Sequence, residues 1–196
     1  MIFFKRHDYI EVYKNAFSKR ECETIISYFE RKPKNYGNIT INGIGRFDTS
    51  VKRCLQLEKP PTFSDNTLIS NILYTNLCKC LEKYKQKYPE LNFIYKWKID
   101  NNYNIQKYST PEDGYKSWHC EHGMDKENIT TQRVLAWMVY LNNAKSGTEF
   151  FRYPTINPGI GQCIIWPAFW THTHRGVCPN QGIKYIATGW ASFEKI

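Results

Sequence analysis

The residues of this chain best suited to chemistry are its histidines, because an imidazole can bind a metal or transfer a proton near neutral pH. His119 and Glu121 are separated only by Cys120. On an extended strand, side chains two residues apart lie on the same face, so this imidazole and this carboxylate can point to one place. Further along the chain, His172 and His174 have the same spacing. The pattern predicts a site built from two adjoining strands.

Two imidazoles and one carboxylate are the ligands of the facial triad that binds Fe(II) in oxygenases, with three coordination positions left open. On spacing alone either His172 or His174 could supply the second imidazole. His122 follows Glu121 directly, and its distance from His119 breaks the alternation of a strand. A His-x-Glu pair with a distant histidine is a weak signal by itself. The pattern indicates a metal site without establishing one.

Lys184 adds a second, independent feature. It alternates with Ile186 and Thr188 on one face of a largely apolar run. A lysine directed into a core needs a carboxylate partner, and no acidic residue lies nearby in the sequence. A dicarboxylate ligand would supply that partner. The alternative is that Lys184 lies on the solvent face, which periodicity does not exclude.

Two helices are expected to brace these strands. Ser18 and Glu21 have the spacing of a capping box, and the apolar residues that follow predict a helix over residues 18–32. A second apolar stripe predicts a helix over residues 64–88, which Pro89 ends.

The rest of the chain predicts short strands. Residues 34–62 are interrupted by Gly, Asn and Pro and are expected to be irregular, although 39–44 could pair as a short strand. Helices followed by many strands indicate helices packed on a β-sandwich or barrel. The predicted strands are β-branched or aromatic runs over residues 93–99, 103–108, 134–141, 163–166 and 185–193.

Taken together, these motifs resemble the 2-oxoglutarate- and Fe(II)-dependent dioxygenases, specifically the prolyl 4-hydroxylase-like group. The chain is most similar to the short members found in viruses and phages. The resemblance covers roughly residues 95–193, and several blocks in the family's order are more specific than one motif. These blocks are residues 103–108, 114–115, 119–121, 132–134, 140–142, 146–150, 161–167, 174–176 and 184–190.

The resemblance implies a metal site made of His119, Glu121 and His174. His174 rather than His172 matches the distal histidine, because its spacing to Lys184 fits the family. The implied cofactors are Fe(II), the cosubstrate 2-oxoglutarate and O2, with ascorbate as a supporting reductant.

The resemblance also implies the residues around the cosubstrate and the substrate. Lys184 matches the basic residue that binds the C5 carboxylate of 2-oxoglutarate, Tyr108 matches a tyrosine that hydrogen-bonds the same group, and Thr148 matches a threonine that contacts it. Arg133 and Trp190 match positions near the peptide substrate in prolyl hydroxylases, and they are the candidate catalytic residues outside the metal site.

Three features depart from the family pattern. Glu121 stands where Asp is usual, and its extra methylene changes the required backbone distance. The Gly-Gly-Glu-Thr block is one residue short before Thr148, and Tyr108 lies further than usual from His119. None of them removes a ligand type.

The implied fold is α+β and mainly β: a double-stranded β-helix (jelly roll) with N-terminal helices packed on its major sheet. We expect a single oxygenase domain over residues 1–196, with a helical support region (1–90) and a catalytic core (91–196).

Composition sets the expected surroundings. Lysine and arginine number 27 against 18 acidic residues, a net charge of +9 that slightly favours an acidic partner such as nucleic acid. Lys5 and Arg6 follow the first apolar triplet, the reverse of a secretory signal, and no apolar run could span a bilayer. The 7 cysteines have no framework spacing, which favours reduced thiols. We expect a cytoplasmic protein without membrane contact, in the host cytoplasm if the chain is viral.

The expected function is hydroxylation of a C–H bond, with a prolyl residue of a peptide or protein as the expected substrate. The same chemistry on nucleic acid or on a free amino acid is one alternative, and a non-catalytic, metal-binding jelly roll is another. A zinc hydrolase is disfavoured, because His-Glu-x-x-His is absent and Lys184 would have no role. The loops expected to determine substrate choice are 34–62 and 122–132.

Overall fold

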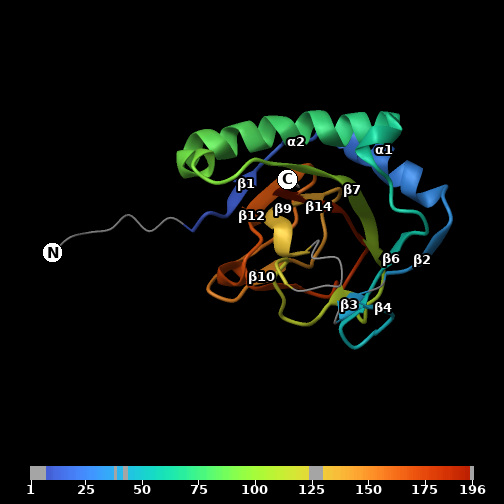
Figure 1. The fold of residues 1–196 in the computed structure, drawn as a ribbon. Helices are drawn as coiled ribbons and strands as arrows, with labels where there is room; N and C mark the ends of the chain where they lie inside the picture. Colours follow the sequence, from blue (N-terminus) through green and yellow to red (C-terminus); the bar gives the residue numbers. More distant parts are fainter. Residues whose placement is uncertain (1–7, 38, 42–43, 124–129, 195–196) are drawn as a thin grey trace.

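Two β-sheets face each other, and two helices cover the outer face of the larger sheet (Figure 1). The computed structural model describes residues 8–37, 39–41, 44–123 and 130–194. This is the predicted jelly roll with N-terminal helices on the major sheet. The larger sheet has the order β1 (Glu11–Tyr13), β12 (Gln162–Pro167), β9 (Arg133–Tyr140), β14 (Lys184–Phe193), β7 (Trp97–Tyr108), β6 (Leu55–Leu57) and β2 (Lys34–Tyr36). The smaller sheet has the order β11 (Tyr153–Ile156), β10 (Thr148–Phe150) and β13 (His174–Gly176).

Side-chain alternation divides the interior into two cores. On β9, Trp137 and Val139 pack under the helices, whereas Met138 and Tyr140 fill the space between the sheets. The same alternation on β14 directs Lys184 to the space between the sheets, where it is 3% exposed. The inward orientation of Lys184 is therefore confirmed, and the solvent-facing alternative is wrong.

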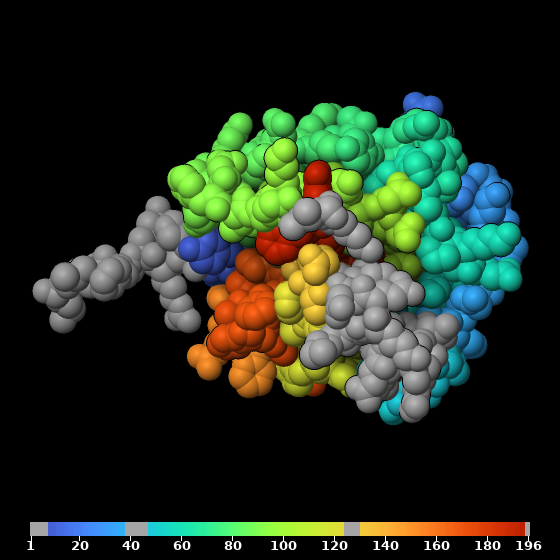
Figure 2. Space-filling view, viewed as in Figure 1, coloured from blue at the N-terminus to red at the C-terminus, as the bar shows by residue number. Residues whose placement is uncertain are grey.

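Each helix begins directly after a residue that caps it. Helix α1 (Lys19–Glu30) starts after Ser18, whose hydroxyl accepts a hydrogen bond from the Glu21 backbone N–H at 3.2 Å, while the Glu21 carboxylate accepts one from the Ser18 N–H at 2.7 Å. Helix α2 (Leu68–Lys87) begins later than predicted, because Ser64 lies in the 3-10 helix η1 (Phe63–Asp65) and Thr67 caps α2. In Figure 2, α2 and the segment that follows it form a continuous layer along one side of the molecule.

The segment 34–62 contains more regular structure than the sequence indicated. Strands β2 and β6 extend one edge of the larger sheet, and β3 (Ile39–Ile41) pairs with β4 (Ile44–Arg46). The predicted strand over 39–44 is thus two strands, although residues 42–43 of that range lie outside the described residues. These strands have two or three residues each, too few for a period to be recognised. A further pair joins β5 (Lys52–Arg53) to β8 (Gly114–Tyr115).

Strand β7 is also longer than either strand predicted for it. It runs unbroken from Trp97 to Tyr108 because β14 pairs with it along almost its whole length, with one register shift near Gly189. The remaining 3-10 helices are η2 (Pro89–Asn92), η3 (Thr130–Gln132) and η4 (Trp170–His172). Neither helix within the described ranges is long and apolar enough to cross a membrane. All seven cysteines are free thiols.

Gly161 is the glycine whose replacement should disturb the fold most. It has φ +73°, and a Cβ there would lie 2.0 Å from the carbonyl oxygen of Phe17, whose N–H donates to the Gly161 carbonyl. Gly161→Ala should therefore lower the free energy of unfolding by about 2 kcal/mol or more. Urea denaturation measures this change. The matched control is Gly182→Ala, which has φ +75° with nothing near its Cβ, and an equal loss there would contradict the role of the Phe17 contact.

Candidate active site

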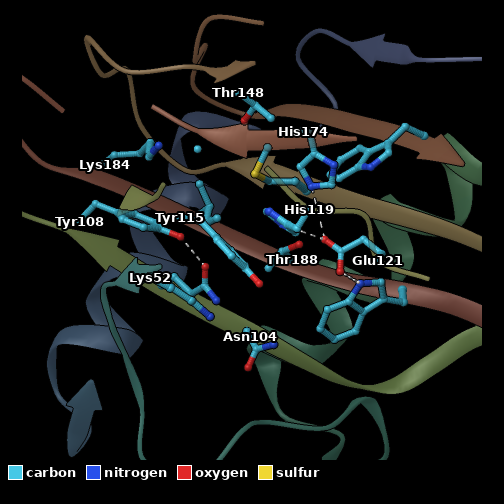
Figure 3. A pocket seen from close by; sticks show the side chains of 16 residues that line it. Lys52, Asn104, Tyr108, Tyr115, His119, Glu121, Thr148, His174, Lys184 and Thr188 are labelled. Atoms are coloured by element: carbon cyan, nitrogen blue, oxygen red, sulfur yellow. Dashed lines mark hydrogen bonds and ion pairs between the residues drawn. The ribbon is translucent and has the colours of Figure 1, made fainter. Parts of the chain in front are cut away.

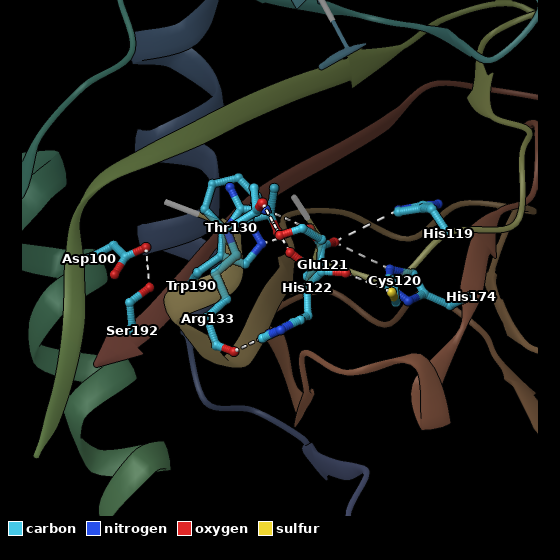
Figure 4. Close-up of polar contacts among 12 residues, drawn as sticks. Asp100, His119, Cys120, Glu121, His122, Thr130, Arg133, His174, Trp190 and Ser192 are labelled. Carbon is cyan, nitrogen blue, oxygen red and sulfur yellow. Dashed lines mark hydrogen bonds and ion pairs between the residues drawn. The ribbon is translucent and has the colours of Figure 1, made fainter. Parts of the chain in front are cut away.

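A cavity between the two sheets contains the residues that the sequence singled out (Figure 3). Its walls come from β5, β7, β8, β9, β10, β12, β13 and β14, together with residues 119 and 121. Seven of the eight predicted site residues line it: Tyr108, His119, Glu121, Thr148, His174, Lys184 and Trp190. The eighth, Arg133, contacts Glu121 from the side (Figure 4).

Three of these residues form a cluster that could hold a metal ion. The nearest ligand atoms of His119, Glu121 and His174 all lie within 4.8 Å of one another. Glu121 Oε1 is 3.4 Å from His174 Nε2 and 3.8 Å from His119 Nε2. Two imidazole nitrogens and one carboxylate oxygen directed at a common point are the donors that Fe(II) accepts in a facial triad.

Backbone carbonyls fix the tautomer of both imidazoles. His119 Nδ1 lies 2.9 Å from the Ser117 carbonyl, and His174 Nδ1 lies 2.9 Å from the His172 carbonyl. A carbonyl only accepts, so each Nδ1 carries the proton and each Nε2 lone pair faces Glu121. Burial lowers the pKa of His119 to about 4, and the neighbouring His174 adds to the shift. His119 is therefore neutral at pH 7, as metal binding requires.

Glu121 is held in its charged form by several donors. Burial raises the pKa of this carboxyl, but the neighbouring His174, His119 and Arg133 side chains together lower it below its ordinary range. Its Oε2 accepts from Trp190 Nε1 at 2.8 Å and from Arg133 Nη1 at 3.4 Å (Figure 4). The Arg133 guanidinium in turn lies 3.7 Å from the centre of the Trp190 ring. Arg133 and Trp190 thus leave Oε1 free to face the imidazoles.

The local structure around the His-x-Glu pair differs from the strand that was predicted. His119 forms only an isolated bridge with His174, through backbone hydrogen bonds of 3.0 and 2.8 Å. The N–H groups of Glu121 and His122 both donate to the Ala168 carbonyl. These contacts tie the pair to the chain before β13 and hold it beside His174.

The prediction that His172 and His174 share a strand face is wrong, since His172 ends η4 and only His174 belongs to β13. Both ring nitrogens of His172 are engaged: Nε2 lies 2.7 Å from the Asp8 carbonyl and Nδ1 lies 2.9 Å from the Thr171 hydroxyl. His122 Nδ1 lies 3.4 Å from the Arg133 carbonyl. Among the described residues, only His119 and His174 bring imidazoles to Glu121 within metal-ligand range.

The predicted cosubstrate residues lie together in another part of the cavity. Lys184 Nζ is 4.7 Å from the centre of the Tyr108 ring and donates to the Val177 carbonyl at 3.1 Å. No carboxylate within the described ranges lies within ion-pair distance of it. Thr148 shares a 2.7 Å hydrogen bond with Tyr140. A buried ammonium without a carboxylate partner, in a cavity that Tyr108 and Thr148 also line, is suited to an anionic ligand.

Nine residues of the cavity wall were not predicted as site residues, among them Lys52, Asn104, Gln106 and Tyr115. Tyr115 stacks on His119, with ring centres 3.6 Å apart, and Gln106 accepts a hydrogen bond from the Tyr108 hydroxyl at 2.7 Å. Asn104 and Gln106 alternate with Tyr108 on β7, so the strand period could have indicated them. Lys52 comes from a segment without a recognisable pattern.

Comparison with known proteins identifies the class. Residues 103–192 match the sequence model of the 2OG-Fe(II) oxygenase superfamily. The matched residues contain all eight predicted site residues, and the reaction of this superfamily uses Fe(II), 2-oxoglutarate and O2. No curated protein matches the chain at a significant level.

Several solved structures share the fold. The viral collagen prolyl hydroxylase of Paramecium Bursaria Chlorella virus-1, in its 2OG complex, has a TM-score of 0.65 and 16% identity, with 95% of this chain and 97% of that chain covered. A Trichoplax adhaerens prolyl hydroxylase bound to a hypoxia inducible factor peptide fragment has a TM-score of 0.65 and 11% identity, with 94% of this chain and 84% of that chain covered. A Pseudomonas putida prolyl-4-hydroxylase has a TM-score of 0.64 and 11% identity, with 95% of this chain and 93% of that chain covered.

Proposed function

We propose that His119, Glu121 and His174 hold Fe(II), and that the enzyme hydroxylates prolyl residues of a peptide or protein. The observation that carries the metal assignment is the convergence of two Nε2 atoms with fixed tautomers on one carboxylate oxygen. Among the residues that the structure describes, no second group of three His, Cys, Asp or Glu side chains could hold a metal ion. We also propose that residues 1–196 form one oxygenase domain, in which β1, β2 and β6 from the first 90 residues complete the larger sheet.

Lys184, Tyr108 and Thr148 would hold the far carboxylate of 2-oxoglutarate. Lys184 would supply the charge that a carboxylate requires, as an ammonium rather than a bidentate guanidinium. Tyr108 and Thr148 line the same part of the cavity and bring hydroxyl groups to it. The bound cosubstrate would give Lys184 the partner that the described protein does not provide.

When bound, the metal and cosubstrate supply oxidative decarboxylation coupled to C–H hydroxylation. The protein positions the reactants and excludes water. Tyr115 holds the His119 ring by stacking, and Trp190 orients Glu121 by its hydrogen bond. Apolar wall residues, including Met138, Trp166 and Ile186, keep the cavity dry.

The prolyl substrate is supported by the structural neighbours, which are prolyl hydroxylases, one of them bound to a peptide. The substrate role expected for Arg133 and Trp190 remains a proposal, supported by the position of Trp190 on the cavity wall. The loop 122–132 was expected to affect substrate choice, and residues 124–129 of it lie outside the described residues.

Succinate formation with Fe(II), 2-oxoglutarate, ascorbate and air tests this function. A proline-rich peptide should stimulate turnover and gain one oxygen atom, measured by mass spectrometry. The control is the same peptide with alanine in place of proline. Stimulation by both peptides alike, without oxygen incorporation at proline, would contradict prolyl hydroxylation while leaving the oxygenase class intact.

The affinity for 2-oxoglutarate should fall in alkaline solution. Burial lowers the pKa of Lys184 to about 8, so the free protein loses this ammonium above that pH. Binding of a carboxylate needs the protonated lysine, and the dissociation constant should therefore be flat below pH 8 and rise up to about tenfold per pH unit above it. Calorimetry without oxygen between pH 7 and 9.5 measures this dependence.

Lys184→Arg is the matched variant, because a guanidinium remains protonated across the whole range. Its affinity should not fall above pH 8. An equal fall in both proteins would assign the titration to another group.

A further inference from the structure

Lys52 is a second buried lysine of the cavity, and the proposed roles for the metal and cosubstrate do not use it. It is 7% exposed and lines the same cavity as His119 and Glu121. Strand β5 carries it beside β8, where Lys52 pairs with Tyr115. Its Nζ lies 5.5 Å from the centre of the Tyr115 ring, and Tyr115 stacks on His119. One aromatic ring therefore separates this ammonium from a proposed iron ligand.

The Lys52 ammonium has no anionic partner in the part of the chain that the structure describes. No carboxylate lies within 4.0 Å of it, and its side chain makes no hydrogen bond there. The cost of burying an ammonium without a partner is several kcal/mol, so such a group is expected to meet an anion when the site is in use. Asn104, on the same wall, offers amide hydrogens beside it.

Lys52 and Lys184 reach the cavity from different elements. Lys184 belongs to β14 and Lys52 to β5, and in the view of Figure 3 Lys184 and Thr148 lie above Tyr108 and Tyr115, with Lys52 and Asn104 below. With Fe(II) and 2-oxoglutarate bound, the positive charges of the metal and Lys184 equal the negative charges of Glu121 and the cosubstrate. Lys52 is then the unbalanced charge among the cavity-lining side chains.

We infer that Lys52 binds a carboxylate of the substrate and so makes this enzyme selective for an anionic group close to the hydroxylated carbon. This inference rests on the proposed function, because it takes the cosubstrate to occupy Lys184. The carboxylate could be an aspartate or glutamate side chain next to the proline, or the terminal carboxylate of a short peptide or free amino acid. Both sources present the same chemistry to Lys52 and Asn104.

The test is binding without oxygen, measured by calorimetry on protein loaded with Fe(II) and 2-oxoglutarate. The probes are a proline peptide with flanking glutamates, the same peptide with glutamines, a short peptide ending at proline with a free or an amidated C-terminus, and free proline. At least one carboxylate probe should bind about tenfold or more tightly than its uncharged or amidated counterpart. Comparison of the peptide pairs identifies which source of carboxylate the site recognises.

Three variants separate charge from structure. Lys52→Met keeps the length of the side chain and should abolish the preference for the carboxylate probe, with unchanged 2-oxoglutarate affinity. Lys52→Arg should retain most of the preference, because it restores the charge. Lys59→Met, an exposed lysine of the same segment, should behave as wild type. Thermal unfolding verifies that each variant is folded.

The inference is overturned if Lys52→Met retains the preference, or if no carboxylate probe binds in a Lys52-dependent way. It is also overturned if Lys52→Met weakens 2-oxoglutarate as much as it weakens the probe, since Lys52 would then serve the cosubstrate. Failure of the proposed function looks different. In that case wild type would bind no 2-oxoglutarate, or would bind it with no dependence on Lys184.

Discussion

His174→Ala should lower Fe(II) affinity by at least about 100-fold and reduce succinate formation to background. The change removes one of two imidazole nitrogens that face Glu121 Oε1, leaving two ligands where a facial triad needs three. His174 is buried and contacts Phe150 and Trp166, so the variant also loses packing. Metal titration of the folded protein, followed by anaerobic calorimetry, separates the loss of a ligand from loss of structure.

His172→Ala is the matched control. Both ring nitrogens of His172 bond to Asp8 and Thr171, and its ring stacks on Tyr153 with centres 5.4 Å apart. The backbone carbonyl that fixes the His174 tautomer survives this substitution. His172→Ala should therefore lower stability and leave iron affinity within a few-fold of wild type. Equal losses of iron affinity in both variants would show that His174 does not act as a ligand.

The comparison of these two histidines shows what the sequence could and could not predict. Their spacing implied one shared face, but that argument holds only on a strand. The chain forms a 3-10 turn at Trp170–His172, and β13 starts only at His174. Spacing to Lys184 selected His174, which is the histidine that lies beside Glu121, and β13 and β14 both line the cavity. The spacing from His174 to Lys184, which joins two strands, was more informative here than the short spacing from His172 to His174.

The long strands β9 and β14 were predicted well, because each has many residues on two apolar faces. Strands β9 and β14 bury both faces, one under the helices and one between the sheets. Apart from the short strand expected over 39–44, the strands of the segment 34–62 were not predicted, since pairing with β7 and β8 decides the structure of β5 and β6 rather than their own residues. Lys52 belongs to this segment, which explains why only the structure brought it to the cavity.

The larger sheet also explains how Lys184 tolerates burial. It pairs with Tyr108 across β14 and β7, and its ammonium donates to the Val177 carbonyl. A buried ammonium with a single neutral acceptor destabilises the free protein, because burial favours the uncharged amine. Burial of the Lys184 ammonium therefore lowers the stability of the free protein and raises its affinity for an anion.

Lys184→Met should both weaken 2-oxoglutarate binding and stabilise the fold. Loss of the ammonium should weaken 2-oxoglutarate binding about 30-fold or more, because the cosubstrate carboxylate would lose its charged partner in a buried site. The same change should raise the free energy of unfolding at pH 7 by roughly 1 to 3 kcal/mol, since a methionine fills similar space without a charge. Anaerobic calorimetry and urea denaturation measure the two effects.

Lys59→Met provides the control, because this exposed lysine should change neither quantity. The stability gain of Lys184→Met should shrink from pH 8 towards pH 10. In that interval the unfolded chain keeps its ammonium protonated whereas the folded protein does not, so the wild-type protein becomes relatively more stable as pH rises. A Lys184→Met protein that binds 2-oxoglutarate as wild type does would remove Lys184 from the cosubstrate site. A loss of stability instead of a gain would show that the ammonium already has an anionic partner in the folded chain.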